Sequence, residues 1–451
     1  MNGRLRTRLF PRFYKGANTS SWRFTESGRL VLLVLLISGI IGLDTRQNLS
    51  FQIFAILLSV IILSVVSSVR RKGHYSVLRK LPTFATVGQE VAYNIEIQNN
   101  SEMELSNLLI IDSPTWQFPT LDEFNNYTDE RSIHENKFDQ LVGFPRWLRQ
   151  TELKIGANDL SGKLSSLTAN STKSISIKLV PLRRGYIYFY GFRVSTADTF
   201  GLIRRFKKIK VKNCLLVLPK RYALPEISLK GSRHNNQNGV SLASSVGESG
   251  EFHSLREYRA GDPQRHVHWR SWAKTGIPMV KTFEQAFFVR HALVLDTFTV
   301  DLPSSIFEEA ISVAASLTSQ LSDQESLLDL MFINKKQYRI TAGRHLGNAQ
   351  YFLETLASLE PQNLDPIKEL GRMVLNYTDT LSNILCIFLR WNVEREKIVT
   401  VLRSRGVNVI VLIMSNQVSD ESSEDIIYLN TNNMRDSLKQ LDRFSTDRSS
   451  K

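Results

Sequence analysis

An apolar stretch from Leu49 to Val69 constrains this chain more than any other feature, because it contains no charged residue. As a helix rising about 1.5 Å per residue it would extend about 30 Å, which matches the hydrocarbon core of a bilayer. A second apolar run, Leu30 to Leu43, precedes it and is separated from it only by a short polar segment. The two runs predict a transmembrane helical hairpin within residues 25–72.

The first run is short for a membrane span, since Leu30 to Leu43 would cover only about 21 Å as a helix. We therefore expect its helix to begin near Thr25, with the Arg29 side chain reaching the membrane surface and Trp22 near the boundary. Two alternatives stay open. One is a cleaved signal peptide, although the small residues near Gly42 form a poor cleavage site. The other is a pair of buried helices in a soluble protein, which the near absence of polar residues in the second run disfavours.

Positive charge flanks both apolar runs and sets the expected orientation. The chain of 451 residues carries a formal net charge of +14. By the positive-inside rule, the basic N-terminus (1–24) and everything after the second run face the cytoplasm, at the plasma (inner) membrane. The bilayer is then the partner that explains the charge, and no groove-reading helix or stacking motif predicts nucleic-acid binding. The flanking cations are Arg4, Arg6, Arg8, Arg12, Lys15, Arg23 and Arg29 before the first run, and Arg70, Arg71 and Lys72 after the second.

Residues 81–220 show the period-two pattern of β-strands. Between Val91 and Gln98, large apolar residues recur at every second position, which predicts a strand with one wet face. Short strands separated by polar turns predict an Ig-like β-sandwich, interrupted by an insertion near 119–172 that mixes polar tracts with aromatic residues. The two cysteines, Cys214 and Cys386, lie in apolar strand-like runs, so we expect them to be core residues in a reducing compartment. The other expected strands are 108–111, 174–180, 186–194, 206–211 and 214–218.

A flexible loop rich in Ser, Asn and Gly is expected at 226–251, followed by a motif segment at 252–284. The part of this segment from Tyr258 to Lys274 crowds acidic, basic, histidine and tryptophan side chains together more than any other stretch of the chain. Asp262 is predicted to cap a helix that begins at Pro263 and ends before Gly276. At helical spacing Arg265, His268, Trp269 and Trp272 share one face, expected to be buried, while His266, Arg270 and Lys274 form a cationic face.

Several roles are open for this segment. It is either a structural junction between domains or a docking surface, since Trp and Arg serve both purposes. A metal site is the weaker idea, because His266 and His268 would lie about 200° apart on a helix with no Cys or acidic ligand beside them. Catalysis by these histidines has no adjacent Ser or Cys nucleophile to support it.

After Lys281 the pattern changes to strands alternating with helices, which predicts a Rossmann-like α/β domain at 290–430, followed by a polar tail at 431–451. In such sheets ligands collect at the carboxyl ends of the strands, where Asp296 stands. Asp296 is therefore a candidate Mg²⁺ ligand, although Phe298 and Val300 occupy the positions where hydroxyl ligands would face the metal. The alternative is a turn or helix-cap role. The expected strands are 292–295, 327–333, 337–341, 384–389 and 407–413, and the expected helices are 305–321, 349–359 and 393–405.

Together these features resemble the bacterial and archaeal family known as domain of unknown function 58 (DUF58), over nearly the whole chain. The segments 25–29 and 197–202 also match that family's pattern. The motif that carries the resemblance is Tyr258-x-x-Gly261-Asp262-x-x-Arg265-x-x-His268-Trp269-x-x-x-Ala273, followed by the strand 279–284 and by Leu293-Val-Leu-Asp296.

The resemblance implies a membrane-anchored protein whose C-terminal domain is similar to a von Willebrand factor A domain. The metal-dependent adhesion site of such domains has the pattern D-x-S-x-S, of which only Asp296 is present here. The family accompanies MoxR-type AAA+ ATPases and membrane proteins with transglutaminase-like domains. We therefore expect a non-enzymatic scaffold, with no catalytic residues and no obligate cofactor, that assists the assembly or maturation of other proteins. A degenerate divalent-metal site at Asp296, in an adhesion module or enzyme, is the alternative.

Overall fold

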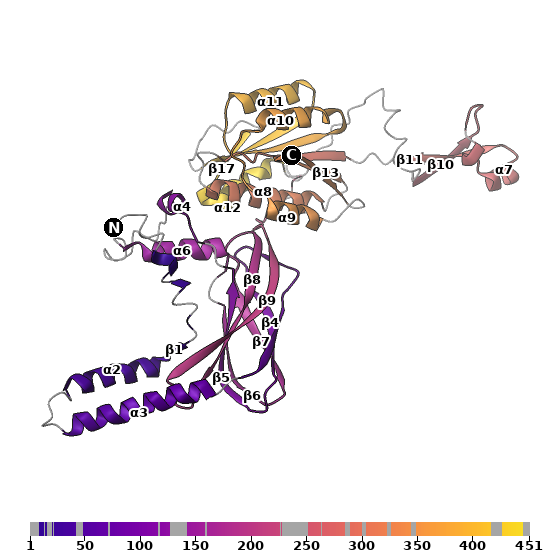
Figure 1. The fold of residues 1–451 in the computed structure, drawn as a ribbon. Coiled ribbons are helices and arrows are strands. Elements are labelled where there is room, and N and C mark those ends of the chain that lie inside the picture. The colour runs from indigo at the N-terminus through magenta and orange to yellow at the C-terminus, as the bar shows by residue number, and fades with distance from the viewer. Residues whose placement is uncertain are drawn as a thin grey trace. The chain divides into compact units, whose positions relative to one another are not determined.

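The structure is a computed structural model of the chain, in which two compact units are distinguished (Figure 1). The first comprises residues 1–220 with 356–358, and the second residues 221–355 with 359–451. The chain is thus multidomain and combines helices with several β-sheets. The structure describes residues 9–12, 14–15, 20, 22–41, 48–70, 73–115, 118–126, 142–157, 160–225, 227, 251–262, 264–284, 289–299, 304–322, 326–343, 349–415 and 426–444.

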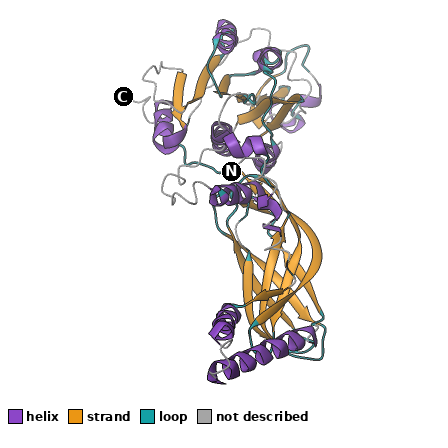
Figure 2. Cartoon of the chain, turned by 60° about the vertical axis from the view of Figure 1, so that its left-hand side comes forward, coloured by secondary structure: helices purple, strands orange, loops and turns teal. Residues whose placement is uncertain are grey.

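Two sheets in the first unit enclose one apolar core, as in a β-sandwich (Figure 2). Ile95 and Ile97 from one sheet and Val194 and Val217 from the other are fully buried in that core. The larger sheet contains β1 (Trp22–Phe24), β3 (Phe84–Thr86), β5 (Leu105–Pro114), β6 (Ser161–Leu167), β8 (Gly185–Ala197) and β9 (Ile203–Leu218). The smaller contains β2 (Tyr75–Lys80), β4 (Val91–Asn99) and β7 (Thr172–Leu179).

Strand β9 differs from the sequence prediction in two respects, its length and the exposure of Cys214. The predicted strands 206–211 and 214–218 form one continuous strand, and a register shift against β8 absorbs the polar residues between them. Period two places Leu215 and Val217 in the core, so Cys214, which precedes Leu215 and points to the opposite face, is exposed rather than buried. Cys386 is buried, as predicted.

The predicted insertion is shorter than 119–172, because β6 belongs to the sheet and pairs with β5. Its small polar residues gave little apolar signal. What remains contains α4 (Leu121–Asn126) and α6 (Phe144–Ile155), with 127–141 outside the described residues. Trp147 is fully buried there, stacked on Phe118 and Phe144 and in edge contact with Phe10 from the N-terminal segment. The insertion therefore has an aromatic core of its own.

Two apolar helices, α2 (Glu26–Ile41) and α3 (Asn48–Arg70), lie side by side in this unit (Figures 1 and 2). They pack closely, since a Cβ added at Gly39 would lie 3.2 Å from the Phe54 ring. Among the described residues one helix, Leu49–Arg70, is long and apolar enough to cross a membrane, and almost none of it is buried. The shorter α2 does not meet that criterion.

Two segments far apart in the sequence, 25–29 at the start of α2 and 197–202 before β9, meet in space. Thr25 Oγ1 accepts a hydrogen bond from Gly28 N (3.0 Å) and donates one to Gly201 O (2.6 Å). A Cβ at Gly28 would lie 2.1 Å from Leu202 O, so only glycine permits this approach. On α3, the Ser64 hydroxyl donates a hydrogen bond to the buried carboxylate of Asp198. The start of α2 and the end of α3 are therefore both fixed to the turn before β9.

The second unit contains a six-stranded sheet in the order β14-β13-β12-β15-β16-β17, parallel except for β14 at one edge. Strands and helices alternate along the chain, as predicted. The strands are β12 (Val289–Leu295), β13 (Ser326–Asn334), β14 (Lys336–Ala342), β15 (Asn383–Phe388), β16 (Asn408–Ser415) and β17 (Ile426–Asn430). The helices are α8 (Ser304–Ser322), α9 (Ala349–Ser358), α10 (Ile367–Leu375), α11 (Val393–Ser404) and α12 (Met434–Leu438).

Both ends of this unit extend beyond the predicted 290–430. At the C-terminus Met434, Leu438 and Leu441 are buried, so this part of the predicted polar tail belongs to the folded domain. Before the predicted loop, Tyr222 Oη donates to Glu309 Oε2 on α8 (2.5 Å), and Ile227, the second residue of that loop, is buried. The rest of the predicted loop, up to residue 250, lies outside the described residues.

Candidate functional site

The motif segment forms a small module built on a hairpin of β10 (Glu251–Glu257) and β11 (Met279–Glu284). The chain between these strands includes a 3₁₀ turn (Gln264–His266) and helix α7 (Trp269–Thr275). Val267 and Val280 form a bridge and are both buried, and His268 N donates to Met279 O (2.8 Å). Main-chain pairing thus fixes α7 to β11.

Asp262 does not cap a helix, contrary to the sequence prediction. Its carboxylate receives two hydrogen bonds from the Arg256 guanidinium, at 2.7 and 2.6 Å, and one from Arg259 N at 2.9 Å. These donors stabilise the ionised form, so they lower the pKa of Asp262 to about 2. The preceding Gly261 has a φ of +108°, which L-residues with side chains rarely adopt. Asp262 therefore ties the chain after β10 into a tight turn.

Helix α7 begins at Trp269, six residues after the predicted start at 263. His268 stands at its N-cap position, and the His268 ring contacts Ser271 Oγ at 2.7 Å. The C-terminal end agrees with the prediction, since Gly276 adopts a left-handed conformation and donates its N–H to Trp272 O. Pro263, the predicted first helical residue, lies outside the described residues.

The tryptophans of α7 face outward, which corrects the prediction of a buried face. Trp269 is 63% exposed and Trp272 37% exposed, and no residue of the helix is buried. The two indole rings stack on each other, with centroids 5.3 Å apart and planes 22° from parallel. Arg270 and Lys274 on the same helix are also exposed. We call this set, Trp269, Arg270, Trp272 and Lys274, the α7 surface.

The remaining motif residues lie in the chain before α7. Tyr258 is 38% exposed, and its N–H bonds to Pro278 O at 2.9 Å. Arg265 is exposed on the 3₁₀ turn. All of the motif residues predicted as a site, namely Tyr258, Gly261, Asp262, Arg265, His268 and Trp269, thus lie in one module.

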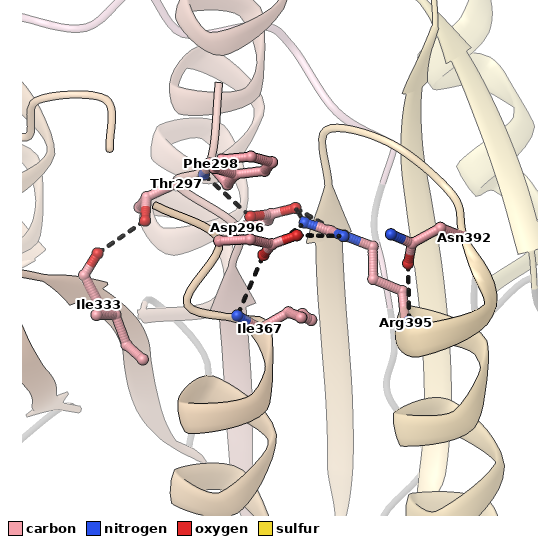
Figure 3. Close-up of polar contacts among 8 residues, drawn as sticks. Asp296, Thr297, Phe298, Ile333, Ile367, Asn392 and Arg395 are labelled. Atoms are coloured by element: carbon pink, nitrogen blue, oxygen red, sulfur yellow. Dashed lines mark hydrogen bonds and ion pairs between the residues drawn. The ribbon is translucent and has the colours of Figure 1, made fainter. Parts of the chain in front are cut away.

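Asp296, the candidate metal ligand, lies at the carboxyl end of β12, next to β15 (Figure 3). Its Oδ2 accepts hydrogen bonds from Arg395 Nε (2.9 Å) and Nη2 (2.6 Å), and its Oδ1 accepts one from Phe298 N (3.1 Å). Both side chains of the pair are fully buried. Burial raises the pKa of Asp296 above its usual value, and the Arg395 charge acts in the opposite direction.

Arg395 comes from the first turn of α11, where the Asn392 side chain caps its N–H at 3.1 Å (Figure 3). It also contacts the Asp365 carboxylate at 3.3 Å. The sequence analysis missed Arg395 entirely, since nothing in its local pattern distinguishes it from the other charged residues of α11. The Thr297 hydroxyl donates to Ile333 O (2.7 Å), away from the carboxylate.

These contacts do not fit a divalent cation at Asp296. Both carboxylate oxygens already accept hydrogen bonds, and a guanidinium of like charge occupies the position that a metal would need. Among the residues that the structure describes, no group of three His, Cys, Asp or Glu side chains is arranged to hold a metal ion. Arg395 therefore supplies the compensating charge.

Comparisons with known proteins leave the family open. No protein-family model matches the chain. Over 201 residues it is 26% identical to YeaD, an uncharacterised protein of Bacillus subtilis. That alignment covers 44% of this chain and 49% of YeaD, so the chain spans about half the length of the curated relative that it matches.

Solved structures give only distant similarity. The CARDB domain of a Pyrococcus furiosus protein aligns with 33% of this chain and 90% of that domain, at 8% identity and a TM-score of 0.17. A β-glucosidase from Listeria innocua aligns with 32% of this chain and 16% of the enzyme, at 11% identity and the same TM-score of 0.17. Neither similarity is close enough to bear on the fold or function.

Proposed function

We propose that this protein is a membrane-anchored scaffold of the DUF58 type, which docks a partner protein through the α7 surface. The observation that carries the proposal is the stacked, solvent-facing pair of Trp269 and Trp272 beside two exposed cations. Exposed tryptophans are costly in water, and Trp and Arg dominate the energetics of protein interfaces. A paired hairpin that presents two such side chains is suited to partner binding.

The proposed anchor is a hairpin of α2 and α3, with both termini and all folded domains on the cytoplasmic face of the plasma membrane. The exposed apolar surface of α3 supports this anchor, because a helix of a soluble core would be mostly buried. Basic residues after α3 support the cytoplasmic orientation. In this proposal the sandwich is an Ig-like spacer and the second unit a von Willebrand factor A-like domain.

The proposed partner is a MoxR-type AAA+ ATPase, with a membrane protein carrying a transglutaminase-like domain as a further member of the assembly. These partners follow from the resemblance to DUF58 alone. The role would be accessory, assisting the assembly or maturation of other proteins without breaking bonds. The chemistry of the α7 surface adds that the partner should present an acidic, partly apolar patch.

Affinity capture from native membranes tests the docking role. The full chain, the variant Trp269→Ala/Trp272→Ala and the control Tyr351→Ala are compared. Tyr351 is a suitable control because it is an exposed aromatic residue, 58% exposed, outside the motif module. Loss of the two tryptophans should weaken capture of the ATPase by roughly thirty-fold or more, because truncating a hot-spot residue costs about 2 kcal/mol or more of binding free energy. Undiminished capture by a folded, membrane-inserted tryptophan variant would rule out the α7 surface as the docking site.

The alternative, a divalent-metal-dependent adhesion module or enzyme, requires Arg395 to leave Asp296 before Mg²⁺ could bind. Calorimetric titration of the full chain with Mg²⁺ or Mn²⁺ separates the two proposals. The scaffold proposal expects no saturable binding at this position. Saturable binding that disappears in Asp296→Asn would favour the metal-dependent alternative instead.

A further inference from the structure

A cationic cavity lies on the β-sandwich, beside the chain that leaves α3. It has a volume of about 270 Å³, and its lining includes His74, Tyr75, Arg205, Phe206 and Lys207. Arg205 Nη1 donates to Val69 O at 3.3 Å, in the last turn of α3, and Lys207 Nζ donates to Gly73 O at 3.2 Å. The cavity therefore lies beside the C-terminal end of α3.

Aromatic rings hold the two cations in place. The Arg205 guanidinium lies over the Trp22 ring, 5.6 Å from its centroid, and Lys207 Nζ lies 5.1 Å from the centroid of the Tyr75 ring. The Tyr75 hydroxyl donates to Val194 O at 3.1 Å, and burial raises its pKa to about 12. Tyr75 is thus neutral at physiological pH and adds no negative charge to the cavity.

Neither cation is neutralised within the described residues, where no carboxylate pairs with Arg205 or Lys207. Arg205 has five N–H donors and Lys207 has three, and each donates one hydrogen bond to a main-chain carbonyl. Two cations that have no carboxylate partner and keep unused N–H donors, in one cavity, are suited to binding a phosphate group.

A second cavity, of about 230 Å³, lies next to the first and is lined by Trp22, Arg23, Phe24, Val65 and Ile203. The two cavities are neighbours because Trp22, which lines the second, pairs in β1 with Arg205 of β9, which lines the first. Val65 precedes Val69 by one helical turn, which places it about 6 Å further along α3 toward the membrane. A phosphate site followed by a mainly apolar cavity on the membrane side matches the order of groups in a phospholipid.

We propose that these cavities bind one anionic phospholipid, with Arg205 and Lys207 on its phosphate and the second cavity on the start of an acyl chain. The inference rests on the membrane anchoring proposed above. Free phosphate shares the same headgroup chemistry, but it would make no use of the apolar cavity. The bound lipid would fix the sandwich at a defined height on the membrane.

Lipid titration of the full chain, delipidated in a neutral detergent, tests the proposal, with bound lipid counted by native mass spectrometry. The probes are dioleoyl phosphatidylglycerol, dioleoyl phosphatidylcholine and inorganic phosphate as a competitor. We expect saturable binding of one phosphatidylglycerol, weaker binding of phosphatidylcholine, and no displacement by millimolar phosphate. Equal binding of the two lipids, or displacement by phosphate, would overturn the proposal.

The variant Arg205→Gln/Lys207→Gln should bind phosphatidylglycerol about thirty-fold more weakly, at about fivefold for each lost cation. The control Lys210→Gln/Lys212→Gln removes the same charge from exposed positions of β9, about 10 to 24 Å further along the strand, and should bind nearly as the native chain does. Arg205→Lys/Lys207→Arg should retain most of the affinity. Equal loss in the site and control variants would show a general charge effect and contradict the assigned site.

Carbonate extraction of native membranes separates this proposal from the proposed anchor. A chain released by carbonate would defeat the membrane-anchored scaffold. A chain that resists carbonate but shows no preference for phosphatidylglycerol would defeat only the lipid site.

Discussion

Replacing Arg395 by Met tests whether the buried ion pair, rather than a metal, stabilises the end of β12. The substitution leaves the Asp296 carboxylate buried without its cation, since both side chains of the native pair are fully buried. Removing one partner of a buried pair costs about 3–5 kcal/mol. At 1.36 kcal/mol for each factor of ten, local opening should become about a hundredfold to a few thousandfold more frequent.

Hydrogen exchange of the full chain, followed by mass spectrometry on peptides from β12 and α11, measures this opening directly. The double variant Asp296→Asn/Arg395→Met should recover about 2 kcal/mol or more, because the unpaired charge is gone. The control Lys368→Met breaks an exposed pair between Lys368 on α10 and Glu394 on α11, with 76% and 45% of the two side chains exposed, and should cost at most about 1 kcal/mol.

A pH series tests the same ion pair independently, through the direction in which the stability of the variant changes with pH. Without Arg395, the pKa of Asp296 should rise further, since the guanidinium is the main group that lowers it. A raised folded-state pKa means that the native form holds its proton more tightly than the unfolded chain, so stability of Arg395→Met should fall as pH rises above about 4. An Arg395→Met chain as protected as the native one at neutral pH would refute the reasoning.

Three further outcomes are expected from the other contacts. The pKa of Asp262 is lowered to about 2, so its bonds to Arg256 stabilise the module fully above about pH 4 and are lost as pH falls toward 2. Circular dichroism of the stacked tryptophans should follow that loss. The variant Asp262→Asn should remove the pH dependence. Gly28→Ala places a Cβ 2.1 Å from Leu202 O and should cost at least about 1–3 kcal/mol, seen as faster proteolysis at the junction. Gly261→Ala should cost about 1–3 kcal/mol from φ strain alone, because no atom lies within 4 Å of the added Cβ; an unchanged exchange rate in β10 would contradict this.

Most secondary structure was predictable because apolar residues repeat at the period of their element. The alternation in β4 and the long apolar helix α3 are local patterns, and both were found close to their bounds. Strand β6 was missed because its small polar residues carry no such period. Helix α7 was misplaced because Asp262, a good N-cap by type, is held by Arg256.

The candidate sites divide in the same way. The motif residues cluster in one module because they are close in sequence, so a segment of the chain predicts the cluster. Which side of that segment faces solvent depends on the pairing of β10 with β11, and periodicity alone assigned Trp269 to the wrong environment. The partner of Asp296 lies 99 residues away, beyond the reach of any local pattern.

By itself the sequence determined the apolar span, the order of the β and α/β regions and the chemical richness of the motif, since these depend on composition and on short repeats. Tertiary structure alone decided that Arg395 compensates Asp296, that segment 25–29 meets segment 197–202, and that Arg205 and Lys207 share a cavity with Tyr75. The physical reason is that charge compensation and close backbone approach depend on distances in space, which strand pairing and packing set across long separations in the chain.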